Sequence, residues 1–473
     1  MLLAIDQGTT GTTCLVVDRE LHVRGRGYRE LTQHFPAPGL VEHDAEELWA
    51  TVLAAADTAL ADAGVAAREL AAIGLTNQRE TTLLWDRRSG DPIGRAIVWQ
   101  DRRTAERCTQ LPAELLRERT GLVPDPYFSA TKLEWLLQHT GTAGDVAFGT
   151  VDSWLAWKLT GEHVTDVSNA SRTLLVALRE LEWDDELLAL FGVPRRVLPR
   201  IVPSSGVVGE ADLLGARVPL AGLAGDQQAA LFGQACFAPG EAKATHGTGT
   251  FVLANAGHQP PQPRPGVLAT CAWQLGRDAP VYALEGSVFV SGAALQWLRD
   301  GLGLLFDAAE SEALARAVPD SGGVVFVPAL AGLGSPHWAP EARGLVCGIT
   351  RATRREHLVR AALEAIAFQT RDVLDAMALD VPVLRTDGGA SANTFLLQFQ
   401  ADIARVPVEV PVERETTALG AAALAGLAVG AWSGTAELAA TWRAAARYEP
   451  QLPEAEAGRL LAAWRSAVAR TLA

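Results

Sequence analysis

This 473-residue chain is poor in cysteine, in excess positive charge and in long apolar runs, and each shortage excludes a class of protein. Its five cysteines are scattered and form no Cys-x-x-Cys, which argues against a disulfide framework or a zinc site and favours a reducing, cytoplasmic compartment. The formal net charge of −14 leaves no surplus of cations to replace the counterions of a nucleic acid. The longest apolar run, 418–432, is rich in Ala and Gly and too short to cross a bilayer, so we expect a buried helix and no membrane insertion.

Familiar short motifs of nucleotide, metal and hydrolase sites are also missing. The sequence contains no G-x-x-x-x-G-K-[ST], no G-x-G-x-x-G that opens a Rossmann unit, no H-E-x-x-H and no G-x-S-x-G. Its nine histidines are scattered, which disfavours metal sites and catalytic triads. Asn169-Ala170-Ser171 matches a glycosylation sequon, and in a cytoplasmic protein we interpret this match as chance.

Length and composition indicate a large globular protein of the α/β class. The length predicts two large domains or three smaller ones, and 48% hydrophobic with 20% charged residues excludes a disordered chain. Asp44 with Glu47 resembles a capping box, and the helix that follows would bury Leu48, Val52 and Ala56. Strand and helix patterns alternate along the chain, as in α/β proteins. The predicted strands are residues 2–6, 13–18, 71–76, 81–85, 96–99, 220–223 and 383–386.

The pattern of the first residues returns near the middle of the chain. Residues 4–10 and 244–250 each form a short strand that enters a Gly/Thr turn, and an apolar strand follows both turns. A Pro-Gly turn at 237–240 predicts a boundary just before the second copy. One interpretation is a duplicated domain, residues 1–236 and 237–473, with two phosphate-facing hairpins across one cleft; the other is two unrelated hairpins.

Carboxylates in Gly-rich turns are the main candidates for chemistry. Asp6 ends a strand before Gly8-Thr9-Thr10, where amides and hydroxyls would cradle phosphates while the carboxylate serves Mg²⁺ directly or through water. Asp226 follows an apolar strand, and its local sequence leaves a structural cap and a catalytic base as alternatives. The turn at 387–390 precedes a predicted helix and suits either an anionic ligand or an ordinary strand-to-helix connection.

A cluster of polar residues, 77–81, follows another buried strand. Arg79 offers only donors and Glu80 only acceptors, which suits a polyhydroxylated ligand because its hydroxyls both donate and accept. The alternative is an ion pair between these two residues in a solvated loop.

Seven segments in this order resemble the FGGY family of carbohydrate kinases, and within it the members that phosphorylate glycerol. The resemblance extends co-linearly from Leu3 to Trp432 and is very specific. It implies two actin-like (ribonuclease H-like) domains that flank a central cleft. The segments are DQGTT (6–10), GLVEHD (39–44), TNQRETT (76–82), IVWQDRR (97–103), DPYFS (125–129), AGDQQAALFG (224–233) and DGGA (387–390).

The resemblance implies ATP-dependent phosphorylation of glycerol to sn-glycerol 3-phosphate, with Mg²⁺ accompanying ATP. Asp226 would be the catalytic base and Asp6 would serve Mg²⁺. A homo-oligomer is compatible with the family. By matching positions, glycerol would contact Arg79, Glu80, Tyr127, Asp226 and Gln227 between the side chains of Trp99 and Phe251, and the nucleotide would contact Thr9, Thr10, Thr248, Gly292, Gln296, Gly389 and Asn393.

The chain also departs from the family pattern. Gly11-Thr12-Thr13 stands where Ser-Ser-Arg is usual, so no Arg meets the phosphates at this point. His246 replaces a Tyr, and residues 39–40 and 335–338 differ as well. The segment 209–217 is short where some bacterial members carry a longer regulatory loop.

Three alternative functions stay open on the sequence. The first is an FGGY kinase for another substrate such as xylulose or gluconate, against which the Arg79-Glu80 cluster and the aromatic residues favour a short polyol. The second is an actin-like ATPase without a small-molecule acceptor, which would not need Asp226. The third is an inactive sugar sensor, against which the retention of Asp6, Asp226 and Arg79 argues.

Overall fold

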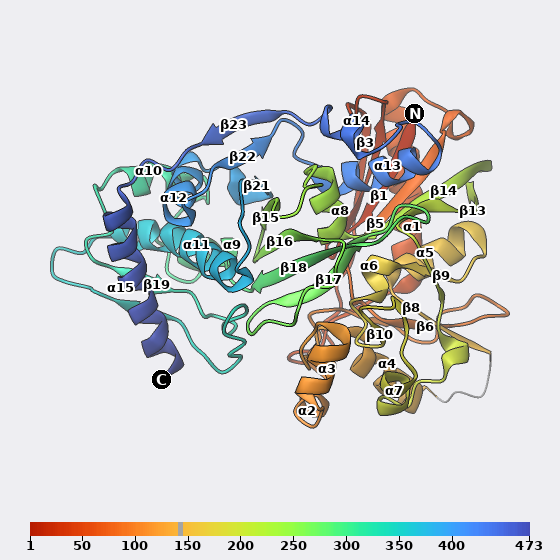
Figure 1. The fold of residues 1–473 in the computed structure, drawn as a ribbon, viewed down its shortest axis with the longest axis horizontal. Helices are drawn as coiled ribbons and strands as arrows, with labels where there is room; N and C mark the ends of the chain where they lie inside the picture. The colour runs from red at the N-terminus through yellow and green to blue at the C-terminus, as the bar shows by residue number, and fades with distance from the viewer. Residues whose placement is uncertain (141–144) are drawn as a thin grey trace.

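The computed structural model describes residues 1–140 and 145–473 and arranges them in two lobes, each around a large β-sheet (Figure 1). The first sheet has the strand order β13-β14-β5-β1-β2-β3 and the second has the order β17-β18-β16-β15-β21-β22-β23. The first consists of β1 (Leu2–Gln7), β2 (Gly11–Val17), β3 (Val23–Glu30), β5 (Ala72–Asn77), β13 (Ser205–Leu213) and β14 (Ala216–Gly225), and the second of β15 (Ala242–His246), β16 (Thr250–Gly257), β17 (Leu268–Trp273), β18 (Val281–Val288), β21 (Leu384–Asp387), β22 (Val408–Pro411) and β23 (Ala444–Tyr448).

Helices cover both sheets, and short strand pairs join the outer segments. The helices of the first half are α1 (Ala45–Ala63), α2 (Ala105–Cys108), α3 (Ala113–Thr120), α4 (Ser129–His139), α5 (Val151–Thr160), α6 (Val167–Ala170), α7 (Asp185–Leu190) and α8 (Asp226–Gly233). Those of the second half are α9 (Gly292–Asp300), α10 (Glu310–Arg316), α11 (Arg355–Met377), α12 (Thr394–Ala404), α13 (Thr416–Ala428), α14 (Thr435–Ala439) and α15 (Glu454–Leu472). The short pairs are β4 (Glu42–His43) with β7 (Ala96–Ile97), β6 (Leu83–Asp86) with β8 (Val146–Gly149), β9 (Val164–Asp166) with β12 (Arg200–Val202), β10 (Val176–Ala177) with β11 (Glu182–Trp183), and β19 (Val325–Val327) with β20 (Leu345–Cys347).

The first sheet brings three strand ends to one edge. Strand β1 pairs antiparallel with β2 and parallel with β5, and β5 pairs parallel with β14. In this register Asp6 lies opposite Thr76, and Asn77 lies opposite Gly225. Because the carboxyl ends of neighbouring parallel strands meet at one edge, the residues that follow them converge there.

The second sheet repeats this arrangement. Strand β15 pairs antiparallel with β16 and parallel with β21, as β1 does with β2 and β5. Both predicted Gly/Thr hairpins are present, and each turn closes with a backbone hydrogen bond of 2.9 Å, from the Gly8 amide to the Gly11 carbonyl and from the Gly247 amide to the Gly249 carbonyl. This shared topology favours the duplicated-domain interpretation over two unrelated hairpins.

Helix α13 belongs to the second half of the sequence but packs on the first sheet. Figure 1 shows it, in blue, beside the red strands at the start of the chain. Its approach is close, since a Cβ at Gly74 of β5 would lie 2.0 Å from the carbonyl oxygen of Ala421. The predicted buried Ala/Gly helix is therefore confirmed, and it closes the face of the first sheet opposite α1 with Leu2, Ala4 and Leu15.

The other face of the first sheet is covered by α1, whose predicted start is only partly right. Asp44 caps the helix and accepts hydrogen bonds from the amides of Glu46 and Glu47, and Leu48, Val52 and Ala56 are buried as expected. The Glu47 carboxylate, however, bonds Thr32 on the preceding segment, so the reciprocal half of the capping box is absent. Sequence spacing does not reveal that Thr32 is the partner of the Glu47 carboxylate, because the contact forms only in the tertiary structure.

Two further predictions concern strand length and the membrane. The expected strands at 81–85 and 96–99 shrink to Leu83–Asp86 and Ala96–Ile97, because each pairs with a short partner outside the two large sheets. None of the helices in the described ranges is long and apolar enough to span a bilayer.

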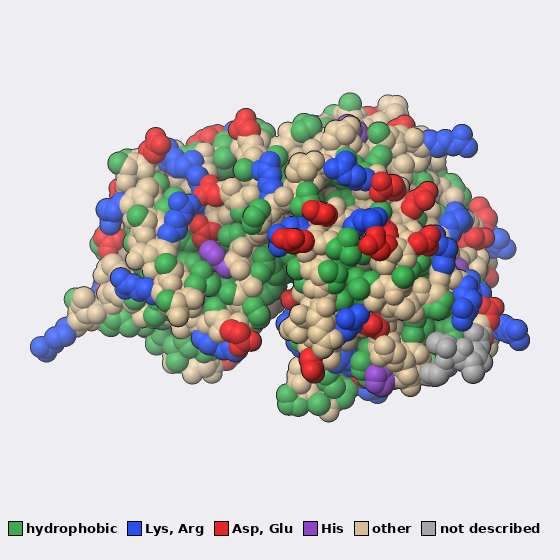
Figure 2. Space-filling model, turned by 60° about the horizontal axis from the view of Figure 1, so that its bottom comes forward, with side chains coloured by type: hydrophobic (Ala, Val, Ile, Leu, Met, Phe, Trp, Pro, Cys, Tyr) green, Lys and Arg blue, Asp and Glu red, His purple; other side chains and the backbone are tan. Residues whose placement is uncertain are grey.

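Figure 2 shows a notch between the two lobes on the face that it presents.

Candidate active site

The loop after β5 turns its charged residues into the protein. Both Arg79 and Glu80 are buried, and Glu80 has a left-handed backbone with φ 61° that reverses the chain immediately after the strand. Such a conformation is costly for a residue with a Cβ and persists where the surroundings enforce it. The alternative of a solvated loop ion pair is therefore wrong.

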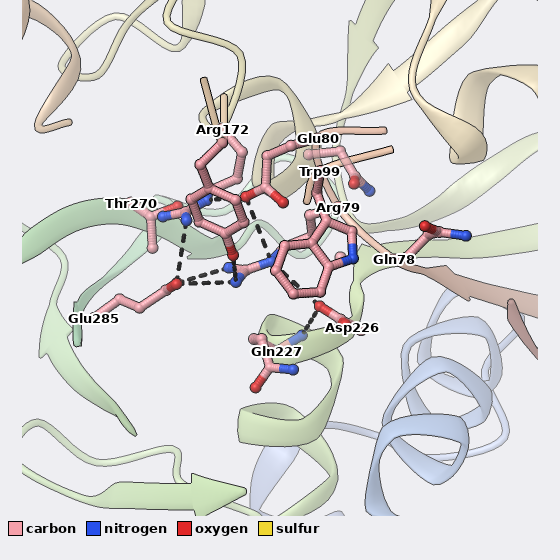
Figure 3. A network of polar contacts seen from close by, with 12 residues as sticks. Gln78, Arg79, Glu80, Trp99, Arg172, Asp226, Gln227, Thr270 and Glu285 are labelled. Carbon is pink, nitrogen blue, oxygen red and sulfur yellow. Dashed lines mark hydrogen bonds and ion pairs between the residues drawn. The ribbon is translucent and has the colours of Figure 1, made fainter. Parts of the chain in front are cut away.

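Arg79 is the centre of a buried network (Figure 3). Its Nη1 donates to Oε2 of Glu285 at 2.6 Å and to Gln228 at 3.2 Å, and its Nη2 donates to Oε1 of Glu285 at 2.9 Å and to the Tyr127 hydroxyl at 3.2 Å. Its Nε lies 3.2 Å from Oδ1 of Asp226. Because the planar fork is held on all sides, the guanidinium has a fixed orientation toward Asp226.

A second buried arginine completes the charge balance. Arg172 donates from Nε to Glu80 at 2.7 Å and from Nη2 to Glu285 at 3.1 Å. Burial opposes the ionisation of Glu285, but the charges of Arg172 and Arg79 prevail and lower its pKa to about 2. For Glu80 burial prevails over the same two charges and its pKa is raised. Since Glu285 lies on β18, this cluster ties the two halves of the chain together.

Asp226 stands at the junction between β14 and α8. It is the first residue of α8, where the helix dipole favours a negative charge. Its Oδ1 accepts the Gln227 amide at 2.7 Å and faces Arg79, while its side chain keeps 29% of its surface exposed. Both recorded contacts of the carboxylate therefore fall on one oxygen, and Oδ2 is the one left for a ligand.

The remaining predicted polyol residues surround this carboxylate. Gln227 accepts a hydrogen bond from the buried Lys243 of β15, so the NH₂ end of its amide is the free end. Burial lowers the pKa of Lys243 to about 8, although Asp387 and Asp226 counteract this. The rings of Trp99 and Tyr127 meet edge to face with centroids 5.6 Å apart.

Phe251 reaches the same region from the second sheet. It lies on β16 opposite Thr245 and Ser287, and in this register it shares a face with Lys243 and Glu285. The second half of the chain thus places Phe251 on the same sheet face as Lys243 and Glu285, which contact Gln227 and Arg79.

The nucleotide candidates lie mainly on the two hairpin turns. Thr10 and Thr248 are exposed at the tips, and the Thr9 hydroxyl accepts from Nε1 of Trp99 at 2.9 Å, which links the first turn to the polyol residues. The start of α9 is built against the second turn, because the amide of Gly292 donates to the Gly247 carbonyl at 3.0 Å.

The three remaining nucleotide candidates, Gln296, Gly389 and Asn393, lie outside the two hairpin turns. Gln296 is exposed one turn further along α9. Gly389 begins a 3₁₀ turn at 389–392, and nothing lies within 4 Å of where its Cβ would be. Asn393 uses its side chain to cap α12 at the Leu396 amide and to donate to Ser311 at 3.3 Å. No recorded contact joins these three to the Arg79 network within the described residues.

Asp6 lies at the same sheet edge under strong negative potential. Burial and the charges of Asp226 and Glu415 together raise its pKa to about 8. A hydrated divalent cation fits such a position, because it would relieve the repulsion between the carboxylates. Outside residues 141–144, no three His, Cys, Asp or Glu residues lie close enough together to hold a metal ion by themselves.

Sequence reasoning missed the residues that complete the network. Glu285, Arg172, Gln228 and Lys243 are buried and contact the predicted site residues. A signal was present, since each of the two strands has a single Asp, Glu, Lys or Arg. This residue is Glu285 in Val281–Val288 and Lys243 in Ala242–His246. A charge in a buried strand indicates a buried partner, but it does not say which one.

Comparisons with known proteins agree with this geometry. Residues 1–233 match the N-terminal domain of the FGGY family of carbohydrate kinases, and residues 242–429 match its C-terminal domain. The chain is 55% identical to glycerol kinase from Dechloromonas aromatica, over 100% of this chain and 97% of that protein. The crystal structure of Plasmodium falciparum glycerol kinase with ADP superposes with a TM-score of 0.94 at 35% identity, covering 100% of this chain and 98% of that one. A xyloylose kinase from Brucella ovis superposes with a TM-score of 0.87 at 27% identity, covering 99% and 97%.

Proposed function

Because this chain belongs to the FGGY family of carbohydrate kinases, we propose that it transfers the terminal phosphoryl group of ATP to glycerol and releases sn-glycerol 3-phosphate and ADP. The observation that carries the proposal is the Asp226 carboxylate, which has one oxygen tied to Arg79 and Gln227 and the other free at the junction of the two halves. A carboxylate in this state can orient a hydroxyl and accept its proton.

The polyol is proposed to lie against Asp226, with its hydroxyls on Glu80, Tyr127 and Gln227 and its carbons between Trp99 and Phe251. All four terminal N–H groups of Arg79 are donated to protein acceptors. A hydroxyl that binds Arg79 must therefore replace one of its two long contacts, 3.2 Å to Gln228 or to Tyr127. In this arrangement Arg79 holds Asp226 in place and also binds the polyol.

The nucleotide is proposed to lie across the two hairpin turns. Thr9, Thr10 and Thr248 would meet the phosphates, and Gly292, Gln296, Gly389 and Asn393 would line the rest of the site. Asp6 would hold hydrated Mg²⁺, which neutralises charge on the phosphates and positions the transferred group. Phosphoryl transfer needs mostly positioning, charge neutralisation and one base, and this set of residues supplies the first and the last.

A polyol panel tests the proposed function. ADP release is measured with glycerol, xylulose, gluconate and no acceptor, and we expect turnover with glycerol to exceed the others by at least about tenfold, because one mismatched group costs about 1–3 kcal/mol in a site built for hydroxyls. Preference for xylulose or gluconate would favour the first alternative, an FGGY kinase for another substrate. Equal turnover without any acceptor would favour an actin-like ATPase.

Glycerol is expected to favour a closed form of the protein. The proposed ligands come from both halves, and a ligand that bridges two halves stabilises the state in which both contact it. We expect new protection from hydrogen exchange in residues 77–81 and in β16, and a smaller radius of gyration in solution scattering. Ethylene glycol, which lacks the third hydroxyl, serves as the control and should have less effect. Absence of compaction together with unchanged protection in both segments would contradict the prediction.

The proposed domain division at residues 236 and 237 bears on this motion. It assigns α13 to the second domain, although α13 packs on the first sheet. Helix α13 is therefore expected to move with the first lobe during closure.

A cytoplasmic location is proposed as well, consistent with the five cysteines, all free thiols in the structure, and with ATP as the donor. The homo-oligomer stays a prediction.

A further inference from the structure

The segment that contains the sequon is buried at the junction of the two lobes and rich in polar groups. Asp166, Ser168, Asn169 and Arg172 are all fully buried. Glycosylation of Asn169 is therefore excluded in the folded protein. Buried polar groups are costly unless they are hydrogen-bonded, so the partners of these side chains show what the segment does.

Asp166 anchors the segment. Its carboxylate accepts the backbone amides of Ser168 and Asn169 at 3.0 and 2.9 Å, the Ser168 hydroxyl at 2.9 Å, the Asn169 side-chain amide at 3.0 Å and the Ser204 hydroxyl at 2.7 Å. Five donors exhaust the acceptor sites of a carboxylate. The hydroxyl proton of Ser168 is thereby committed to Asp166, and the oxygen lone pairs of Ser168 are directed elsewhere.

Ser168 connects this anchor to the candidate base. Its hydroxyl oxygen accepts the backbone amide of Gly225 at 2.9 Å, and Gly225 directly precedes Asp226. Arg79 packs closely over Gly225, since a Cβ at this glycine would lie 2.7 Å from the Arg79 side chain. The Ser168 bond thus holds the end of β14 at the point where the chain turns into α8.

Asn169 connects the same anchor to the neighbouring strand end. It exchanges two amide hydrogen bonds of 3.1 Å with Asn77, whose Nδ2 also donates to the Gln78 carbonyl at 2.8 Å. Asn77 and Gly225 are paired in register, and Arg79 lies two residues beyond Asn77. One anchored segment therefore holds the ends of both strands. The residues that follow these ends include Arg79 and Asp226, which form the 3.2 Å contact.

We propose that Ser168 is a positioning residue, which sets the place of the Asp226 carboxylate through the backbone amide of Gly225, with Asp166 as its anchor and Asn169 fixing the opposite strand end. The proposal rests on the proposed function for its kinetic readout. Ser168 itself makes none of the proposed substrate contacts, because it acts through the backbone amide of Gly225. A small displacement of the base lowers the rate more than the affinity, because the other proposed polyol contacts stay in place, and a shift of about 1 Å costs up to about 10²-fold in rate.

Ser168→Ala tests the proposal. We expect kcat with glycerol to fall between tenfold and a hundredfold, while KM for glycerol and for ATP changes less than threefold. Thr173→Ala is the matched control, since Thr173 is also buried on this segment, and among the described residues its hydroxyl bonds only the Ala170 carbonyl and the Leu175 amide. Its kcat should stay within twofold of wild type, even if both variants lose similar thermal stability.

A second variant and a second measurement keep the proposal testable if Ser168→Ala does not fold. Ser168→Cys keeps a hydrogen-bonding atom in a slightly larger side chain with a weaker acceptor, and its kcat should lie between those of wild type and Ser168→Ala. A crystal structure of either variant should show the Arg79–Asp226 contact longer than 3.2 Å. An unchanged contact, or equal kcat losses in Ser168→Ala and Thr173→Ala, would overturn the proposal. No wild-type turnover with glycerol would instead overturn the proposed function, and the crystallographic distance would still decide the role of Ser168.

Discussion

Replacement of Asp226 by Asn is expected to lower kcat for glycerol by about 10²–10⁴, the usual contribution of a general base, with little change in nucleotide affinity. The structure makes this substitution informative, because the contacts with Arg79 and with the Gln227 amide both fall on Oδ1. The Asn side chain can keep its oxygen in that place. Its NH₂ group then replaces Oδ2, so a donor stands where the glycerol hydroxyl needs an acceptor for its proton.

The measurement is steady-state kinetics with glycerol and ATP, together with ADP binding by calorimetry. Asp212→Asn is the control, since this carboxylate is exposed on the neighbouring β13, and it should leave kcat unchanged. If Asp226→Asn keeps more than about a tenth of the wild-type kcat, less than 1.4 kcal/mol of the barrier depended on the carboxylate. Asp226 would then be a structural cap and the base would lie elsewhere.

Replacement of Glu285 by Ala is expected to destabilise the folded protein by about 3–5 kcal/mol, because it leaves two buried guanidinium groups without their shared carboxylate. Glu285 holds Arg79 through both oxygens and Arg172 through one, and all three side chains are buried. Their mutual attraction offsets the cost of removing each charge from water. After the substitution Glu80 remains as a partner, but the pair that joins the two halves is lost.

Chemical denaturation followed by tryptophan fluorescence measures this loss. Asp185→Ala is the matched control, because Asp185 and Arg195 form an ion pair of the same length, 2.6 Å, with side chains 83% and 55% exposed. An exposed pair contributes about 0–1 kcal/mol, so the two substitutions should differ by several kcal/mol. Equal losses would mean that Glu285 contributes no more than a surface charge.

The sequence predicted the elements that depend on local patterns. The strands at 2–6, 13–18 and 71–76 and the buried helix at 418–432 appear close to their expected bounds. Alternating and continuous apolar runs determine which face of an element is buried, whatever covers it. The two Gly/Thr hairpins were predictable for the same reason, since turn residues act on their immediate neighbours.

The candidate site was only half predictable. Arg79, Glu80 and Asp226 follow apolar strands, and parallel strands bring such positions to one edge. The resemblance to a known family assigned them roles that local sequence left open. Glu285 was missed because its contact with Arg79 spans 206 residues, and a lone charge in an apolar strand carries no record of its partner. Asn169 was interpreted as a chance sequon, which its burial confirms, but its pairing with Asn77 was not predicted.

By itself, then, the sequence determined the class of fold, the strand ends that carry carboxylates and the family to which the chain belongs, because these follow from periodicity, turn chemistry and motif order. Only the tertiary structure decided that α13 closes the first sheet, that Arg79 and Glu80 are buried with Arg172 and Glu285, and that Asp226 keeps one free oxygen. The physical reason is that burial and charge pairing are properties of residues far apart in the chain. The free energies of burial and charge pairing depend on which surfaces come into contact after folding, and a local sequence pattern does not show which surfaces these are.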